Sequence, residues 1–176
     1  MFTGSIFLPN TSTNYAEGQQ LAQFIVQYER QYLLDYFGYT LGTAIINNIG
    51  SGTPDADLDK IIEGDTFIDD EGVTQGWIGF SNTFLLSPIA NYIYCKVQQQ
   101  RDSLSTGVGE MFPIAENNIR TDAGAKVTNA WNEMCDMNYM LHKYMKANED
   151  VTAYADYVGI VDSNAYLFNK TNRFSL

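Results

Sequence analysis

The residue types that could carry out chemistry are most concentrated in an acidic run, DADLDKIIEGD, which begins at Asp55. Asp55, Asp57 and Asp59 alternate as calcium ligands do in an EF-hand loop. That loop needs glycine at its sixth position and a bidentate glutamate at its twelfth. This chain has Lys60 and Thr66 at those positions. The run therefore does not predict a calcium site, and we expect no metal ion to bind there.

The same run is well explained as a short helix. Acidic side chains in a first helical turn interact favourably with the helix dipole. Thr53 and Pro54 provide a capping hydroxyl and a proline where no amide donor is needed. Asp55, Asp59 and Glu63 recur every four residues, so we expect them on one solvated face. A second acidic stretch, DTFIDDEG, is interpreted as a solvated turn, with a weak cation site as the alternative.

A nucleophilic site would require Cys95 or Cys135, the one histidine, His142, and an orienting carboxylate to come together. Nothing in the sequence indicates that they do. A single histidine without a Cys-x-x-Cys pair also lacks the companions that zinc needs. We interpret both cysteines as reduced core residues and predict that the protein is not an enzyme and has no cofactor.

The stretch RDSLSTGVGEMF, residues 101–112, invites comparison with a phosphate-binding glycine loop. Such a loop follows a strand and places backbone amides around an anion at a helix start. Here the glycines follow a helical pattern, no Gly-Lys-Ser/Thr comes next, and Glu110 would repel an anion. We instead predict that residues 103–120 form a projecting arm, with a merely mobile loop as the alternative. The candidate contact residues of the arm are Leu104, Val108, Met111 and Phe112.

The composition is that of a folded and strongly acidic chain. It has 176 residues, 45% of them hydrophobic, and its formal charge is 10 minus 21, or −11. This length suits a single domain with a sizeable core. The negative charge disfavours a groove that binds nucleic acid. Residues 1–10 lack the features of a signal peptide, and no window approaches a membrane span, so we expect an intracellularly made protein without membrane contact.

Apolar residues recur at helical spacing along most of the chain. The pattern predicts a mainly α fold: an antiparallel helical bundle with an extended arm or small β element and extended termini, 1–14 and 159–176. Gly38 separates the first two helices. Ser81 is the expected cap of the third long helix, in which Pro88 produces a kink or a restart at Ser87. Expected helices span 16–37, 39–49, 54–63, 82–101, 123–148 and 151–158, with a small hairpin or ordered loop at 65–79.

Three groups of large side chains are assigned from these patterns. The predicted core comprises Leu21, Phe24, Ile25, Tyr28, Leu41, Ile45, Leu85, Ile89, Ile93, Val127, Trp131, Met134 and Leu141. Tyrosines on helix faces suit half-buried contacts between subunits; these are Tyr28, Tyr32, Tyr36, Tyr92, Tyr94, Tyr139 and Tyr144. Exposed apolar groups at the C-terminus must fold back or dock on a partner. We favour docking, with Tyr166, Leu167, Phe168, Arg173 and Phe174 as the contact residues.

Several stretches carry a resemblance to a known family. They are FIVQYERQYLLDYFGYTLG, GWIGFSNTFLLSPIANYIYCKV, SLSTGVGEMF, AKVTNAWNEMCDMNYMLHKYM and the closing YLFNKTNRFSL. A first helix ends in an aromatic-glycine turn, a Trp-x-Gly turn leads into a long helix, and a serine/glycine arm precedes the last one. In this order the features resemble the head–tail connector, or adaptor, proteins of tailed bacteriophages and prophages.

The resemblance implies a homo-oligomeric ring, usually of twelve copies, in the virion between the portal protein and a tail or head-closure protein. DNA would pass through its channel without specific binding, and Asp55, Asp59 and Glu63 are candidates to face that channel. The subunits would be made in the cytoplasm of the bacterial host. We expect the 103–120 arm to be mobile in the free subunit and ordered against a neighbour in the ring.

Two other classes of function stay open at this level. One is a small helical ligand- or cation-binding domain, or enzyme, with an acidic pocket at 65–71. The other is a helical interaction module without a phage role. The mass in solution separates a ring from both, and stabilisation of a monomer by a divalent ion or small molecule would favour the first.

Overall fold

The computed structural model describes residues 15–49, 51–101, 104–106, 109–111, 123–157 and 168–171. Its helices are α1 (Tyr15–Phe37), α2 (Tyr39–Ile49), α3 (Ala56–Glu63), α4 (Pro88–Arg101) and α5 (Ala123–Ala147), followed by a 3₁₀ turn, Thr152–Tyr154. Its strands are β1 (Asp65–Ile68), β2 (Thr74–Trp77), β3 (Leu104–Thr106) and β4 (Gly109–Met111). The predicted mainly helical fold with a small β element is confirmed.

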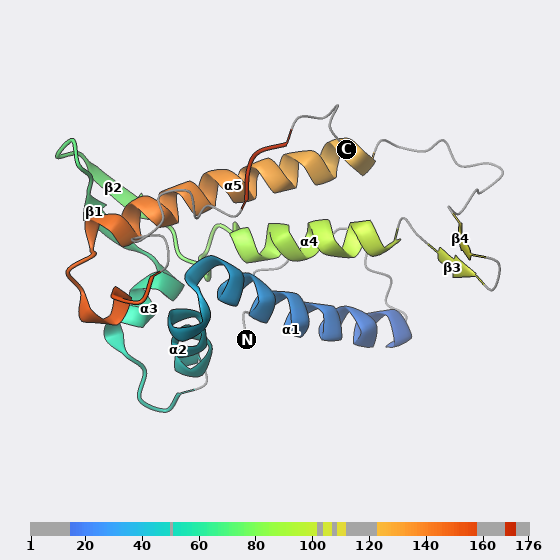
Figure 1. Cartoon of the computed structure of the whole chain (residues 1–176), viewed down its shortest axis with the longest axis horizontal. Helices are drawn as coiled ribbons and strands as arrows, with labels where there is room; N and C mark the ends of the chain where they lie inside the picture. The colour runs from blue at the N-terminus through green and yellow to red at the C-terminus, as the bar shows by residue number, and fades with distance from the viewer. Residues whose placement is uncertain are drawn as a thin grey trace.

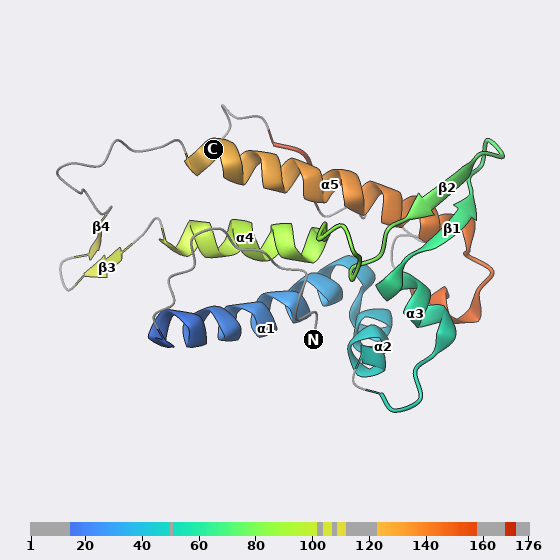
Figure 2. The same cartoon turned by 180° about the vertical axis from the view of Figure 1, so that it is seen from behind.

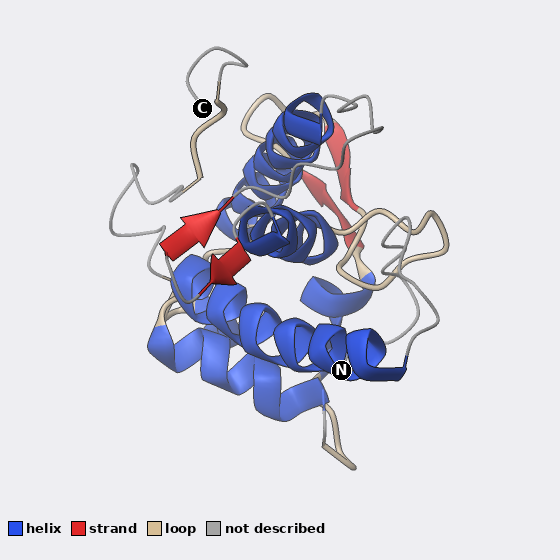
Figure 3. Ribbon diagram, turned by 90° about the vertical axis from the view of Figure 1, so that its right-hand side faces the viewer, coloured by secondary structure: helices blue, strands red, loops and turns tan. Residues whose placement is uncertain are grey.

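The long helices α1, α4 and α5 form an antiparallel bundle in which α4 lies between the other two (Figures 1 and 2). The shorter α2 packs on the C-terminal half of α1. The two antiparallel hairpins lie at opposite ends of the bundle (Figure 1), so that in the end-on view one hairpin lies in front of the helices and the other behind them (Figure 3). The hairpin β1–β2 pairs Asp65 with Trp77 and Ile68 with Thr74, which confirms the expected hairpin in 65–79.

The break between α1 and α2 follows from Gly38. Its φ of 82° lies in the left-handed region that favours glycine, and its amide donates to the carbonyl of Leu34 at 3.0 Å to close α1. The chain turns here and α2 packs back on α1. The backbones approach so closely that a Cβ at Gly42 would lie 2.7 Å from the carbonyl oxygen of Leu33. The sequence predicted this break correctly.

Two helix starts differ from the prediction. The cap of α3 is Asp55, not Thr53, because the Asp55 carboxylate accepts from the amides of Asp57 and Leu58. The third long helix begins at Pro88 rather than at 82, so the expected helix at 82–87 is wrong and there is no earlier helix for Pro88 to kink or restart. Proline is well suited to the first helical turn, where its missing amide would be unpaired in any case.

The core is built mainly from aromatic rings. Tyr32 is fully buried and packs against the rings of Phe80, Tyr92 and Phe168. Of the predicted core, Tyr28, Leu41, Ile45, Ile89, Ile93, Met134 and Leu141 are buried, whereas Phe24, Ile25, Val127 and Trp131 are half-buried. Leu85 is wrong: it is 56% exposed because the chain at 81–87 is not helical. Leu21 lies outside the residues whose side chains are described.

Most of the tyrosines assigned to subunit contacts are instead core residues. Tyr28, Tyr32, Tyr36, Tyr92 and Tyr144 are buried within the subunit, and Tyr139 is exposed. The hydroxyl of Tyr32 donates to Asn138 Oδ1, and that of Tyr36 donates to the Asn138 carbonyl at 2.8 Å. A tyrosine whose hydroxyl finds a partner can be buried whole. Asn138 lies on α5, far along the chain from both tyrosines.

The C-terminal segment folds back where the structure describes it. Phe168 is 9% exposed and packs among rings of α1, α4 and α5, so its predicted docking on a partner is wrong. The carbonyl of Asn169 accepts from Trp131 Nε1 at 2.9 Å, and Lys170 pairs with Asp136. The other tail candidates, Tyr166, Leu167, Arg173 and Phe174, lie outside the described residues, as does the 1–14 tail.

Within the predicted 103–120 arm the structure describes one hairpin. Strands β3 and β4 pair with each other in antiparallel register, with Leu104 opposite Met111 and Thr106 opposite Gly109. The hairpin lies beyond the C-terminal end of α4 (Figure 1). Val108 and Phe112 lie outside the described residues. The expected ordering of the arm against a neighbour stays a prediction.

Candidate interaction surfaces

The residues considered for catalysis lie inside the bundle. His142 is buried, its Nδ1 lies 3.0 Å from the hydroxyl of Tyr157, and burial lowers its pKa. Cys95 and Cys135 are free and buried, as predicted. Desolvation raises the pKa of each thiol to about 11, the opposite of what a nucleophilic cysteine needs. These groups are therefore placed as core residues.

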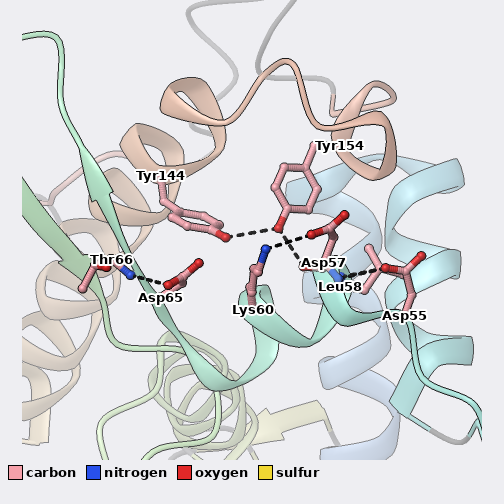
Figure 4. A network of polar contacts seen from close by, with 8 residues as sticks. All are labelled: Asp55, Asp57, Leu58, Lys60, Asp65, Thr66, Tyr144 and Tyr154. Carbon is pink, nitrogen blue, oxygen red and sulfur yellow. Dashed lines mark hydrogen bonds and ion pairs between the residues drawn. The ribbon is translucent and has the colours of Figure 1, made fainter.

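The acidic residues around α3 take part in a polar network (Figure 4). Asp57 forms an ion pair with Lys60 at 2.9 Å, and its carbonyl accepts from the hydroxyl of Tyr154 at 2.6 Å. The Tyr144 and Tyr154 hydroxyls lie 3.1 Å apart, and burial raises both pKa values. The network joins α3 to the end of α5 and the 3₁₀ turn. It holds together segments that are distant in the sequence.

Asp55, Asp59 and Glu63 do not share one solvated face, so that prediction is wrong. Asp55 and Glu63 are exposed, but Asp59 is only partly exposed because it packs towards α2. Asn48 of α2 donates from Nδ2 to Asp59 Oδ1 at 2.9 Å and accepts the Asp55 amide at 2.6 Å. This asparagine is a tertiary partner that helical spacing cannot reveal. That Asp55 and Glu63 face a channel stays a prediction.

The acidic segment between β1 and β2 is a turn organised by Asp69. Its Oδ1 accepts from the amides of Val73 at 2.8 Å and Glu71 at 3.1 Å, and its Oδ2 accepts from Gln75 Nε2 at 3.1 Å. These hydrogen bonds, that of Val73 first, lower the pKa of Asp69 despite the opposing effect of desolvation. The carboxylate oxygens are thus engaged in the turn itself.

A shallow hollow of about 230 Å³ lies between this turn and α5. Its acidic wall includes Asp70 and Glu71, and its opposite wall carries Lys143 and Lys146. Lys143 Nζ also lies 5.2 Å from the centre of the Tyr139 ring. The two lysines bring positive charge to the acidic turn. Among the described residues, no group of three or more His, Cys, Asp or Glu side chains could hold a metal ion.

Among the described residues, three consecutive exposed apolar side chains, Phe84, Leu85 and Leu86, form a turn, which we call the apolar turn. The three side chains are 70%, 56% and 51% exposed. The side chain of Asn82 holds the backbone, since its Oδ1 accepts from the amides of Phe84 and Leu86 and its Nδ2 donates to the carbonyls of Gly79 and Leu86. Leu85 has a φ of 58°, which is uncommon for a bulky residue.

A second apolar surface is a groove between α1 and α2, which we call the apolar groove. It has a volume of about 240 Å³ and is lined by Val26, Leu33, Ile46 and Ile49, with Glu29 and Arg30 on α1. Val26 is 50% exposed although it lies on a helix that packs on two others. Neither this groove nor the apolar turn was predicted from the sequence. The stretch NTFLLSP, residues 82–88, with proline at a helix start, is the signal that could have revealed the turn.

Helix α2 and the segment between β2 and α4 lie on opposite sides of the subunit (Figures 1 and 2). Helix α2, which forms one wall of the groove, is nearest the viewer in Figure 1. The segment between β2 and α4, which contains the apolar turn, is nearest the viewer in Figure 2. The apolar turn and the apolar groove are therefore formed by different elements of one copy.

No protein-family model, curated protein or solved structure matches this chain. Over the part of the chain that the structure describes, none of the helices combines the length and the apolar character needed to cross a membrane.

Proposed function

We propose that this chain is a structural virion protein, a subunit of a head–tail connector ring between portal and tail. The observation that carries the proposal is the pair of non-identical apolar surfaces, which different elements of the subunit form. A ring is built from heterologous contacts, in which one face of a subunit meets a different face of the next. A symmetric dimer would need only one self-complementary face. Two different faces are therefore the arrangement that favours a ring.

The charge supports the DNA-conduit part of the proposal. The chain carries a formal charge of −11, and Asp55 and Glu63 are exposed at α3. A channel that lets DNA pass should offer few basic contacts, because neutralising phosphates is what gives proteins their general affinity for DNA. The acidic α3 is the candidate for the channel lining. In this proposal DNA passes without specific binding.

The partners are then the other copies of the chain, in a ring for which twelve is the expected number, the portal protein and a tail or head-closure protein. The hairpin β3–β4, which lies beyond one end of the bundle, is the candidate for reaching a neighbour (Figure 2). The role is structural rather than catalytic. It agrees with the burial of His142, Cys95 and Cys135 in the core.

The test is the assembly state of the full chain, alone and with portal rings. Light scattering should give a mass that is a multiple of 19.8 kDa, and electron microscopy should show closed rings, in solution or on the portal. The assembly should not retard duplex DNA at physiological salt. A chain that stays monomeric and ignores portal rings, or that retards DNA strongly, would contradict the proposal.

The alternative is a small-ligand or cation-binding role for the hollow beside the 65–71 segment. Its one favourable observation is that it brings Asp70, Glu71, Lys143 and Lys146 around about 230 Å³. This is smaller than most pockets for drug-sized ligands, which run from about 300 Å³ upwards. A monomer whose melting temperature rises with calcium, magnesium or a zwitterionic small molecule would favour this role over the ring.

A further inference from the structure

We propose that the apolar turn of one copy docks into the apolar groove of the next copy, and that this contact propagates the ring. The inference rests on the proposed ring for its closure. It assigns the two faces of the heterologous contact: Phe84, Leu85 and Leu86 on one side, and Val26, Ile46 and Ile49 over Leu33 on the other.

The apolar turn is preorganised for insertion. Asn82 binds it through four side-chain hydrogen bonds, at 3.1 Å to the Gly79 carbonyl, 2.6 Å to the Leu86 carbonyl, 3.0 Å to the Phe84 amide and 3.4 Å to the Leu86 amide. A segment already held in its bound shape loses less conformational entropy on association. The left-handed φ of Leu85 is the kind of local strain that clusters at functional sites. The fold thus maintains the exposure of these side chains.

The groove matches the turn in chemistry and scale. Its floor and walls are the aliphatic side chains of Val26, Leu33, Ile46 and Ile49, and its volume is about 240 Å³. Binding energy in protein interfaces concentrates where a large anchor side chain fills a pocket and water is excluded around it. A phenylalanine flanked by two leucines is an anchor of that kind. The groove and turn would supply the centre of a larger interface, which other contacts complete.

The local charges identify the occupant as a second copy. The chain carries 21 acids against 10 bases, so most pairs of its faces repel each other. The stretch 81–87 has no charged residue. The groove contains one acid, Glu29, and one base, Arg30. These two surfaces can meet without like-charge repulsion, whereas a basic partner would be drawn to the acidic faces instead.

The geometry makes the contact intermolecular. The groove is lined by residues of α1 and α2 alone, so a copy's own turn, which lies between β2 and α4, does not fill it. A protruding apolar element that fits a pocket elsewhere on the same molecule produces a head-to-tail contact, which closes into a ring when the rotation between copies allows it.

The test uses two full-length variants with complementary defects. The turn variant, Phe84→Ser with Leu85→Asn, removes the anchor, and asparagine tolerates the left-handed conformation better than leucine does. The groove variant, Val26→Glu, changes an exposed helical position and places glutamate four residues before Arg30, which favours the helix. The control is Ile68→Thr, which removes a 66% exposed apolar side chain elsewhere.

Wild type and control should assemble alike, and each complementary variant alone should self-associate at least tenfold more weakly, giving a mass of 19.8 kDa. An equimolar mixture should form a heterodimer of 2 × 19.8, or 39.6 kDa, because one intact turn and one intact groove remain. If the turn variant alone were monomeric but the groove variant alone still assembled, the docking would be overturned. A mixture that stays monomeric would also overturn it.

A disulfide test covers weak association. Phe84→Cys with Val26→Cys in one chain should give a ladder of cross-linked multimers on oxidation, while the native Cys95 and Cys135 are buried. Wild-type rings that both complementary variants leave intact would overturn the docking and leave the proposed function standing. A wild-type chain that stays at 19.8 kDa, forms no ring on the portal and gives no ladder from the double-cysteine variant would overturn both.

Discussion

The substitution Phe168→Ala tests how the C-terminal segment is held. Phe168 is 9% exposed, although it lies in a short described segment far from the helices in sequence. Its ring centre lies 5.8 Å from that of Tyr32, 5.6 Å from that of Tyr92 and 5.7 Å from that of Trp131. Around it, Asn132 exchanges two hydrogen bonds with the backbone of Thr171. The aromatic ring is thus the apolar anchor of a polar attachment.

The expected loss of stability comes from this burial. Removing a buried phenylalanine side chain typically costs about 3–5 kcal/mol. The segment can detach instead of leaving an empty cavity, which limits the loss, so we expect about 3 kcal/mol. At about 2–4 °C per kcal/mol for a chain of this length, the melting temperature should fall by roughly 6–12 °C.

The measurement is urea denaturation followed by circular dichroism, together with a thermal melt. The control is Lys170→Ala, a substitution in the same C-terminal segment. It removes an exposed ion pair in which Lys170 Nζ lies 2.6 Å from Asp136 Oδ1. Exposed pairs of this kind contribute about 0–1 kcal/mol. If Phe168→Ala and Lys170→Ala both remained within about 0.5 kcal/mol of wild type, the packing of Phe168 against the bundle would be refuted.

Lowering the pH from about 7.5 to about 5.5 should destabilise wild type more than His142→Gln, measured as the change in melting temperature. Burial lowers the pKa of His142 below 6.5, so the imidazole takes up a proton more readily in the unfolded chain than in the folded one. The free energy of unfolding therefore falls as the pH drops below the pKa of the unfolded chain. An equal pH dependence of the melting temperature in wild type and His142→Gln would contradict this. Gly79→Ala should cost more than about 2 kcal/mol on denaturation, because φ is 80° and the new Cβ would lie 2.3 Å from the Glu63 carbonyl carbon. Gly76→Ala, with open space around its Cβ, is the control, and similar losses at both would refute the argument. A chelator should leave the melting temperature unchanged, and a clear fall would revive the 65–71 segment as a cation site.

The helices and their breaks were readable from the sequence because their causes are local. Apolar residues at helical spacing placed α1, α2 and α5 within a residue of their observed bounds. Gly38 ends α1 by its own backbone freedom, and the acidic turn of the hairpin is closed by Asp69 bonding to neighbours up to six residues away. The chemistry of proline explains why α4 begins at Pro88, but the sequence placed that helix start too early, at residue 82.

The candidate contact surfaces depended on residues that meet only in the folded chain. Tyr32 and Tyr36 are buried because Asn138, more than 100 positions away, accepts their hydroxyl hydrogens. The same residues in another fold would be surface tyrosines, since a phenol ring with an unpaired hydroxyl is costly to bury. Asp59 likewise turns from solvent towards Asn48 of α2. Helical spacing predicts which residues share one face of a helix, but it does not predict which other part of the chain packs on that face.

The turn and groove show the same division. The sequence determined that Phe84, Leu85 and Leu86 are apolar and that a proline follows closely, and on those grounds they were assigned to a helix with Leu85 inward. The structure instead exposes them for a local reason: Asn82, two and four residues away, accepts from the backbone amides of Phe84 and Leu86 and so keeps the segment out of a helix. The groove exists only where α2 folds back on α1, since Val26 and Ile46 come from different helices. Local hydrogen bonding and periodicity depend on residues that are neighbours in the sequence. A groove between two helices depends on the packing of residues that are distant in the sequence.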